Sequence, residues 1–259
     1  MAADQIYKET IDLLNSTTRI EIYNVNCEAT KNIAFMPSSS LVLEDIEHEG
    51  GNAIMSAYHQ DTKFFRALDK KSENFAAIGV ENLEDMAFKG ATYAMENGIT
   101  FKNTIIDFHG TQHFEKRTDG KPHKLNFGET ELQVSASGSP TNYNDKTSQY
   151  FQLLGKFQTT QSQTLLGACN ANKCTEVVKK MSGDMNTTIY GHKSYSYSAN
   201  LDNGRFYWGL LNQIMSKLDG NSNNQGKYIK VSPDGKVTDT KGVKFGVKSS
   251  NAGEITIDP

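Results

Sequence analysis

Apolar residues along the chain change between the three-to-four spacing of helices and the short continuous runs of buried strands. The most regular helical segment is 82–98, where leucine, methionine and alanine recur on a single face. Asn82 precedes this segment as a candidate N-cap, and Gly98 follows it where helices commonly end in glycine. The pattern predicts a helix over 82–98 that leads into an apolar strand over 99–108.

The same alternation continues through the middle of the chain. Apolar spacing predicts helices over 145–158, 174–182 and 206–218, with short apolar strands over 164–169 and 186–194. Helices that alternate with buried strands are typical of a mostly parallel sheet covered by helices on both faces. The predicted fold class is therefore α/β, with a mostly parallel central sheet flanked by helices.

The two ends of the chain carry weaker patterns. We expect a short helix over 4–15, and the alternating segment 19–25 predicts a half-buried strand. Turn signals divide the lysine-rich end into short strands, which predicts a β-hairpin or flap. The expected organisation is an N-terminal extension or accessory region (1–75), a core (76–220) and a C-terminal β-flap (221–259).

Composition and charge narrow the class of protein. Hydrophobic residues make up 37% of the chain and charged residues 22%, as in ordinary globular proteins. A net charge of −3 gives no overall attraction to nucleic acid. No run approaches the roughly 18 apolar residues of a membrane-spanning helix. We therefore expect neither a nucleic-acid partner nor a membrane span.

Cysteine content and the N-terminal sequence bear on location. Three cysteines are too few for a disulfide framework, which favours a reducing compartment. The first residues lack the basic stretch and apolar run of an ordinary secretory signal. The expected location is a reducing cytoplasm, including that of a host cell if the chain is exported without a signal of this kind.

Two residues that suit nucleophilic catalysis stand at the ends of predicted strands. His109 follows the strand over 99–108, and Cys169 ends the strand over 164–169. Ligands of parallel sheets bind beyond the carboxyl ends of the strands, so two such side chains would emerge at one edge. Because a histidine activates a thiol by taking its proton, we expect His109 as the general base and Cys169 as the nucleophile.

Backbone amides and neighbouring side chains complete the predicted site. The N–H groups of Gly110 and Cys169 stand where preorganised donors would hold a developing oxyanion. Asp107 lies two residues before His109, and His192 lies at the end of the next predicted strand. We expect both side chains at the same sheet edge, as candidate substrate-pocket residues.

The segments TIIDFHG (104–110) and QTLLGAC (163–169) resemble the strand ends that carry the catalytic histidine and cysteine of caspase-like (clan CD) cysteine peptidases. Within that clan, the chain looks closest to the autoprocessing protease domains of bacterial toxins and effectors, whose nucleophile strand is similar to LLGACN (165–170). The resemblance implies a caspase-like fold and an endopeptidase that needs only the His–Cys dyad, with no metal or required cofactor. It also implies a protein or peptide substrate, either the chain itself or a host protein.

The C-terminal segment 227–248 carries six lysines against two aspartates. The toxin domains are similar here too, since a basic β-flap follows their protease core. The resemblance implies inositol hexakisphosphate as an allosteric activator. The candidate polyanion-binding residues are Lys227, Lys230, Lys236, Lys241 and Lys244. A second interpretation is that these lysines protect the edge of a hairpin from association.

A zinc site and a non-catalytic interaction module are alternatives that use the same residues. His109, His113, Cys169 and Cys174 together offer four zinc ligands. The H-x3-H spacing needs a helix, and the glycine directly after His109 argues against one. Cys174 has a plainer interpretation as a packed thiol, because free cysteine is among the most buried residue types. A protein that keeps the fold without the chemistry would be a binding module.

A papain-like hydrolase is the remaining alternative. Cys169 precedes His192 in the chain, and Asp202 is available to orient the imidazole. Papain-like enzymes place the cysteine at the start of a helix, whereas an apolar strand leads into Cys169. The order of His109 before Cys169, each at a strand end, therefore favours the caspase-like interpretation.

Overall fold

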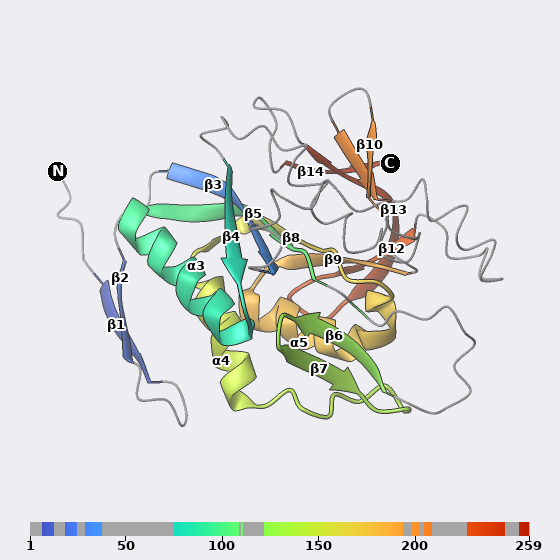
Figure 1. Ribbon diagram of the computed structural model, residues 1–259, viewed down its shortest axis with the longest axis horizontal. Helices are drawn as coiled ribbons and strands as arrows, with labels where there is room; N and C mark the ends of the chain where they lie inside the picture. Colours follow the sequence, from blue (N-terminus) through green and yellow to red (C-terminus); the bar gives the residue numbers. More distant parts are fainter. Residues whose placement is uncertain are drawn as a thin grey trace, which may run out of the picture.

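The computed structural model of the chain describes residues 7–12, 19–24, 29–37, 75–108, 110, 122–193, 198–201, 205–208, 227–246 and 254–258 (Figure 1). Over these ranges the chain forms an α/β structure in which a mainly parallel group of strands is flanked by three helices. The fold class predicted from the alternation of helices and strands is confirmed at this level.

The main sheet has ten strands among the described residues, and five of them form a parallel half. These five lie side by side in the order β4-β3-β5-β8-β9. Their bounds are β3 (Ala29–Pro37), β4 (Phe75–Val80), β5 (Ile99–Ile106), β8 (Gln158–Leu166) and β9 (Thr188–His192). β4 and β5 lie on opposite sides of β3. The direction in which successive strands are added to the sheet therefore reverses at β3. Reversals of this kind mark ligand sites in open α/β sheets.

Antiparallel strands continue the sheet beyond β9. β12 (Lys227–Val231) pairs with β9, and β13 (Val237–Gly246) pairs with β12. Three short strands complete this side, namely β10 (Ser198–Leu201), β11 (Arg205–Trp208) and β14 (Ile255–Asp258). The last described segments of the chain therefore extend the same sheet that contains β3, β5 and β8.

Three described helices form one layer against the sheet. They are α3 (Leu83–Asn97), α4 (Asp145–Gly155) and α5 (Thr175–Met185), and α4 packs against both of the others. The helices predicted over 82–98, 145–158 and 174–182 are thus confirmed. The second helical layer that the sequence predicts is not among the described residues. No helix in the described ranges is long and apolar enough to cross a membrane.

The ends of α3 are those that the sequence predicts. The side chain of Asn82 accepts a hydrogen bond from the N–H of Asp85 at 2.9 Å, which satisfies one of the free amides of the first turn. Gly98 ends the helix with φ 57°, a conformation that costs glycine little. Local sequence therefore decides where this helix starts and stops.

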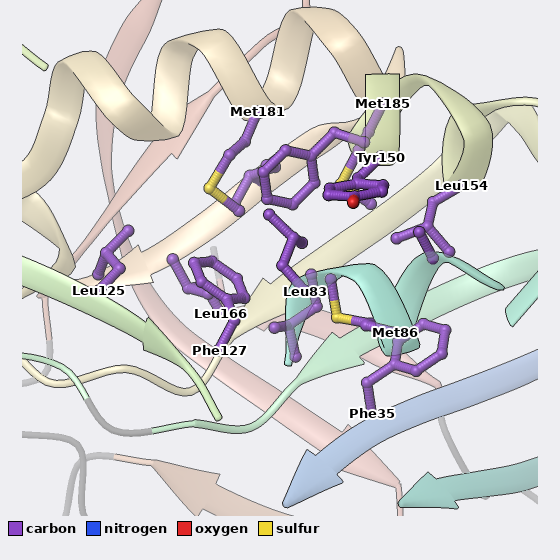
Figure 2. Close-up of a cluster of buried hydrophobic side chains, with 14 of the residues drawn as sticks. Phe35, Leu83, Met86, Leu125, Phe127, Tyr150, Leu154, Leu166, Met181 and Met185 are labelled. Carbon is purple, nitrogen blue, oxygen red and sulfur yellow. The ribbon is translucent and has the colours of Figure 1, made fainter. Parts of the chain in front are cut away.

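Side chains along the parallel strands alternate between two buried faces. Phe35 of β3 and Leu166 of β8 face the helix layer, where the core also contains Leu83 of α3 and Met181 of α5 (Figure 2). Met36, the neighbour of Phe35, belongs to the other face and is equally buried at 0% exposure. Both faces are covered, as parallel sheets require.

A separate hairpin is docked on the start of α3. It consists of β6 (His123–Phe127) and β7 (Thr130–Val134). Its turn residue Gly128 has φ 62°, and a Cβ there would lie 1.9 Å from the carbonyl oxygen of Glu81. Because only glycine allows so close an approach, this residue fixes the hairpin against the helix layer.

Two expectations for the first part of the chain differ from the structure. The helix predicted over 4–15 is wrong for residues 7–12, which form β1 (Tyr7–Asp12), paired antiparallel with β2 (Arg19–Asn24). Residues 29–37 fall in the expected N-terminal extension, yet they form β3, which lies between β4 and β5 in the main sheet. β1 takes its conformation from pairing with β2, and β3 from strands distant in sequence, so local spacing does not reveal either of them.

The helix predicted over 206–218 is also wrong where the structure describes it. Residues 205–208 form β11, which pairs antiparallel with β10 and β13. Phe206, Tyr207 and Trp208 are aromatic residues, which favour strands once a partner strand is present. The rest of that predicted helix lies outside the described residues.

Phe151 on α4 is a central contact of the helix-side core. It is fully buried, edge-on to Phe127 at 5.7 Å and stacked on Tyr143 at 5.9 Å. We expect Phe151→Ala to lower the free energy of unfolding by about 3–5 kcal/mol, because it removes these contacts and leaves a cavity. The exposed neighbour Gln152 provides a control, because Gln152→Ala should change the free energy of unfolding by only about 0.5 kcal/mol. Equal effects of both substitutions in urea denaturation would contradict this core.

Candidate active site

The carboxyl ends of β5 and β8 lie side by side. The two strands are parallel, and their pairing runs to Ile106 opposite Leu166. It continues one residue further, because the N–H of Gly167 donates to the carbonyl of Ile106 at 2.9 Å. The segments 107–110 and 167–169, which hold the two predicted catalytic residues, therefore leave the sheet from adjacent positions.

The backbones of Gly110 and Cys169 pack directly against each other. A Cβ at position 110 would lie 2.0 Å from the carbonyl oxygen of Cys169 and 2.8 Å from its amide nitrogen. Gly110 also forms an antiparallel bridge with Leu125 of β6, so its backbone lies between the hairpin and the Cys169 segment. Any side chain at this position would force the two segments apart.

His109, the predicted general base, lies outside the described residues. Its covalent neighbours are described on both sides. Phe108 is 4% exposed and belongs to the helix-side core, and Gly110 is packed against Cys169. The contact with Cys169 is therefore one residue from His109 along the chain.

Cys169 stands at a sharp turn between a strand and a helix. Asn170, the next residue, has φ 52°, a left-handed conformation that asparagine tolerates better than most residues. The chain then enters a short 3-10 helix, η2 (Ala171–Cys174), and continues into α5. Gly191 of β9 makes room for this turn, since a Cβ there would lie 2.8 Å from the Cβ of Ala171. The turn is thus held against a neighbouring strand.

The two cysteines of this segment have different surroundings. Cys174 is 1% exposed and belongs to the helix-side core, and burial raises the pKa of its thiol to about 12. A thiol with so high a pKa carries almost no thiolate at neutral pH and is inert. Cys169 keeps 9% exposure, and neither thiol is in a disulfide. The structure agrees with a packed Cys174 and makes Cys169 the better candidate nucleophile.

Asp107 is a buried carboxyl at the same edge. Its exposure is 5%, and burial raises its pKa from 3.8 to about 7. Its N–H donates to the carbonyl of Phe35 at 2.9 Å, which ties it to β3. One carboxyl oxygen lies over Gly167, where a Cβ would approach it to 2.2 Å. The carboxyl therefore sits in space that only a glycine two residues before Cys169 leaves open.

Gly167 is a site residue whose role the sequence alone does not reveal. The signal was present as the glycine of LLGAC, two positions before the candidate nucleophile. Its meaning depends on the neighbouring segment, because the group that occupies the space is the carboxyl of Asp107, which directly follows β5. Such a contact cannot be read from either segment alone.

His192, a predicted pocket residue, ends β9 as a fully buried side chain. Its ring lies 4.6 Å from that of Tyr228 on β12, and burial lowers its pKa to about 3. An imidazole with this pKa is neutral at physiological pH and too weakly basic to act as an efficient general base. This weighs against the papain-like pairing of Cys169 with His192, and Asp202 lies outside the described residues.

The candidate polyanion-binding lysines lie on β12, β13 and the turn between them. Lys227 and Lys230 are three positions apart on β12, so they project to opposite faces of the sheet. Lys236 is on the turn, and Lys241 and Lys244 are on β13. The lysines therefore do not form a single cluster on one face.

The described residues do not test the zinc alternative as a whole. His109 and His113 lie outside those residues, and within the described ranges no group of three or more His, Cys, Asp or Glu side chains is placed to hold a metal ion. Cys174 points into the helix-side core, to which Cys169 does not belong. Two thiols in such different surroundings are poorly placed to share one ion.

The raised pKa of Asp107 predicts how stability depends on pH. The folded state keeps its proton up to about pH 7, whereas the unfolded chain releases it near 3.8, so stability should fall as pH rises between these values. The full difference corresponds to roughly 4 kcal/mol. We expect Asp107→Asn to flatten this decline in urea denaturation, and the exposed Asp145→Asn to leave it unchanged. An unaltered slope in Asp107→Asn would contradict the buried carboxyl.

Comparison with known proteins adds no relative to this picture. No family model, curated protein or solved structure matches the chain. The function proposed below therefore rests on the residues and contacts of the chain itself.

Proposed function

We propose that this chain is a caspase-like cysteine endopeptidase that uses His109 as general base and Cys169 as nucleophile. The observation that carries the proposal is the packing of Gly110, the residue after His109, against the backbone of Cys169. Support also comes from the parallel pairing of β5 with β8, which brings the two strand ends together in the order His then Cys. Cys174 is not a better nucleophile than Cys169, because burial raises the pKa of its thiol. His192 is not a better base than His109, because burial lowers the pKa of its imidazole.

In the proposed reaction, His109 takes the thiol proton of Cys169, and the thiolate attacks the carbonyl carbon of the scissile peptide bond. The N–H groups of Gly110 and Cys169 stabilise the oxyanion that forms. The carbon–nitrogen bond then breaks while the imidazolium returns its proton to the leaving amine. Water hydrolyses the resulting thioester and restores the thiol. The close approach of Gly110 to Cys169 supports this pairing of donors, because both amides lie in one small volume.

Asp107 is a positioning residue in this proposal. It directly follows β5, two residues before His109 in the chain, and its carboxyl is buried over Gly167, two residues before Cys169. With a pKa of about 7, it changes charge near neutral pH, as do many groups at catalytic sites. Its carboxyl orients the neighbouring groups and does not itself react.

The substrate class that fits is a protein or peptide, since the dyad chemistry acts on acyl groups. By its resemblance to toxin and effector domains, the chain cleaves itself or a host protein. Three cysteines are too few for a disulfide framework, which suits a reducing cytoplasm. A non-catalytic binding module remains the second candidate, and it is distinguished by the reactivity of Cys169.

Thiol reactivity tests the dyad without knowledge of the substrate. We expect iodoacetamide, followed by peptide mass mapping at several pH values, to modify Cys169 far faster than Cys174, whose pKa is about 12. His109→Ala should move the pH dependence of Cys169 alkylation up to the ordinary thiol pKa of about 8.5. His192→Phe, which keeps a ring beside Tyr228, is the matched control and should leave it in place. A shift in His192→Phe alone would favour the papain-like pairing.

Cleavage assays provide the second arm of the same test. Cys169→Ala and His109→Ala should each reduce self-cleavage, or cleavage of a peptide library, by at least about 100-fold. Full activity in either variant would reject the dyad. Rapid cleavage that needs Cys174 instead would reject Cys169 as the nucleophile.

We further propose that inositol hexakisphosphate binds the lysine-rich flap around Lys227 and Lys241. These two residues are direct partners across β12 and β13, and like charges placed opposite each other are destabilising without an anion. β12 also pairs with β9, whose Gly191 contacts the turn after Cys169. These contacts support a physical route from the flap to the candidate site.

A thermal shift measures this binding. At low salt, inositol hexakisphosphate should raise the apparent melting temperature, because it binds the folded state, and added salt should reduce the effect. Lys227→Gln should weaken the shift, whereas Lys173→Gln on η2 should not. An absent shift, or an equal loss in both variants, would contradict a specific site.

A further inference from the structure

A hollow lies toward the amino ends of the parallel strands, away from the edge that carries Cys169. It has a volume of about 500 Å³, within the range of small-molecule pockets. β3, β5 and β8 line one side, and the C-terminal strand β14 with its preceding residue lines the other. The residues that line it include Lys102, Asn103, Thr160, Gln163 and Glu254.

Buried amide side chains form the floor of this hollow. Asn103 on β5 donates to the side-chain oxygen of Asn32 on β3 at 2.9 Å, and the two residues are only 6% and 4% exposed. Gln163 on β8 is the direct register partner of Asn103, so their side chains share a face of the sheet. Three adjacent parallel strands thus place a row of amides where aliphatic side chains are the rule.

One polar atom in this row lacks a partner. The side-chain oxygen of Gln163 is buried and has no hydrogen bond within the described part of the chain. Burying an acceptor without a donor is unfavourable, so such atoms call for an explanation. A ligand that donates a hydrogen bond in the hollow would supply the missing partner.

The wall beside Gln163 is an irregular segment of β8. The register runs from Phe101 opposite Gln158 to Asn103 opposite Gln163, so β8 carries extra residues there. Ser162 holds this bulge, since its hydroxyl accepts from the N–H of Thr159 at 2.8 Å and donates to the carbonyl of Phe101. Bulges often re-aim side chains beside binding sites, and this one brings threonine hydroxyls to the hollow.

Charge at the hollow is balanced. Lys102 and Glu254 lie 3.5 Å apart, and both side chains are about half exposed, as expected at a rim. The other groups that line it are neutral amides, hydroxyls and one isoleucine. A strongly charged ligand would find no net complement here, in contrast to the lysines of β12 and β13.

We propose that this hollow binds a neutral polyhydroxylated molecule, such as a sugar or sugar alcohol. Each hydroxyl of such a ligand both donates and accepts, and amide side chains offer an acceptor and a donor side by side. The oxygen of Gln163 accepts from one ligand hydroxyl, and the Asn103 and threonine groups bind its neighbours. The site joins β14 to the parallel strands and does not depend on the chemistry at Cys169.

The test uses D-glucose and D-mannitol as probes with the full chain. Saturation-transfer NMR and thermal shift should show binding of at least one of them. Gln163→Leu should weaken that binding about tenfold, because it removes the buried acceptor. Without ligand, Gln163→Leu should be at least as stable as the parent protein, because it removes a buried oxygen that has no hydrogen-bond partner in the described part of the chain. Gln152→Leu on α4 is the control and should bind like the parent.

Thr160→Ala keeps the test decisive if Gln163→Leu fails to fold. Thr160 is exposed at the rim, so its substitution should spare the fold while weakening binding severalfold. Three results would overturn the proposal. The first is that neither D-glucose nor D-mannitol binds, and the second is that Thr160→Ala and Gln163→Leu bind them as tightly as the parent does. The third is that inorganic phosphate or a blocked dipeptide binds as tightly as the two probes.

Discussion

The parallel ladder between β5 and β8 is the contact on which both ends of the central sheet depend. At its carboxyl end, the pairing carries over to Gly167 and brings Gly110 onto the backbone of Cys169. At its amino end, the same pairing loses its regular step and forms the bulge that lines the polar hollow. One set of hydrogen bonds therefore positions two chemically different regions. The carboxyl ends of parallel strands lie together at one edge of the sheet, and their amino ends lie together at the opposite edge.

Three glycines that leave room for closely approaching groups shape the candidate active site. Gly110 admits the carbonyl of Cys169, Gly167 admits the Asp107 carboxyl, and Gly191 admits the turn that follows Cys169. Each glycine belongs to a different strand or strand extension, so the site is assembled from three directions. A Cβ at any of the three would meet an atom at 2.8 Å or less. The geometry around Cys169 is therefore set by rigid elements, which is what a catalytic constellation requires.

Burial separates the ionisable groups of this edge by function. Desolvation keeps Cys174 protonated and His192 neutral, which makes both unsuited to nucleophilic or base chemistry. Desolvation also raises the pKa of the Asp107 carboxyl to about 7, so this group changes charge near neutral pH. Cys169 keeps more exposure than Cys174 although only a short turn separates them. Burial therefore decides these differences, and its effect on the pKa depends on whether the charged form is an anion or a cation.

The sequence by itself determined the helices of the middle of the chain, because α3 and α4 carry their own caps and apolar faces. It also determined that His109 and Cys169 follow apolar strands, and hence the candidate dyad. It could not place β1, β3 or β11, because the strands with which they pair decide their conformation, and for β3 and β11 these include strands far away in sequence. Only the tertiary structure decided that Asp107 lies over Gly167, that His192 is buried against Tyr228, and that Asn103 and Gln163 are register partners on adjacent strands. These are contacts between strands, and strand register is a property of the whole sheet that no single segment encodes.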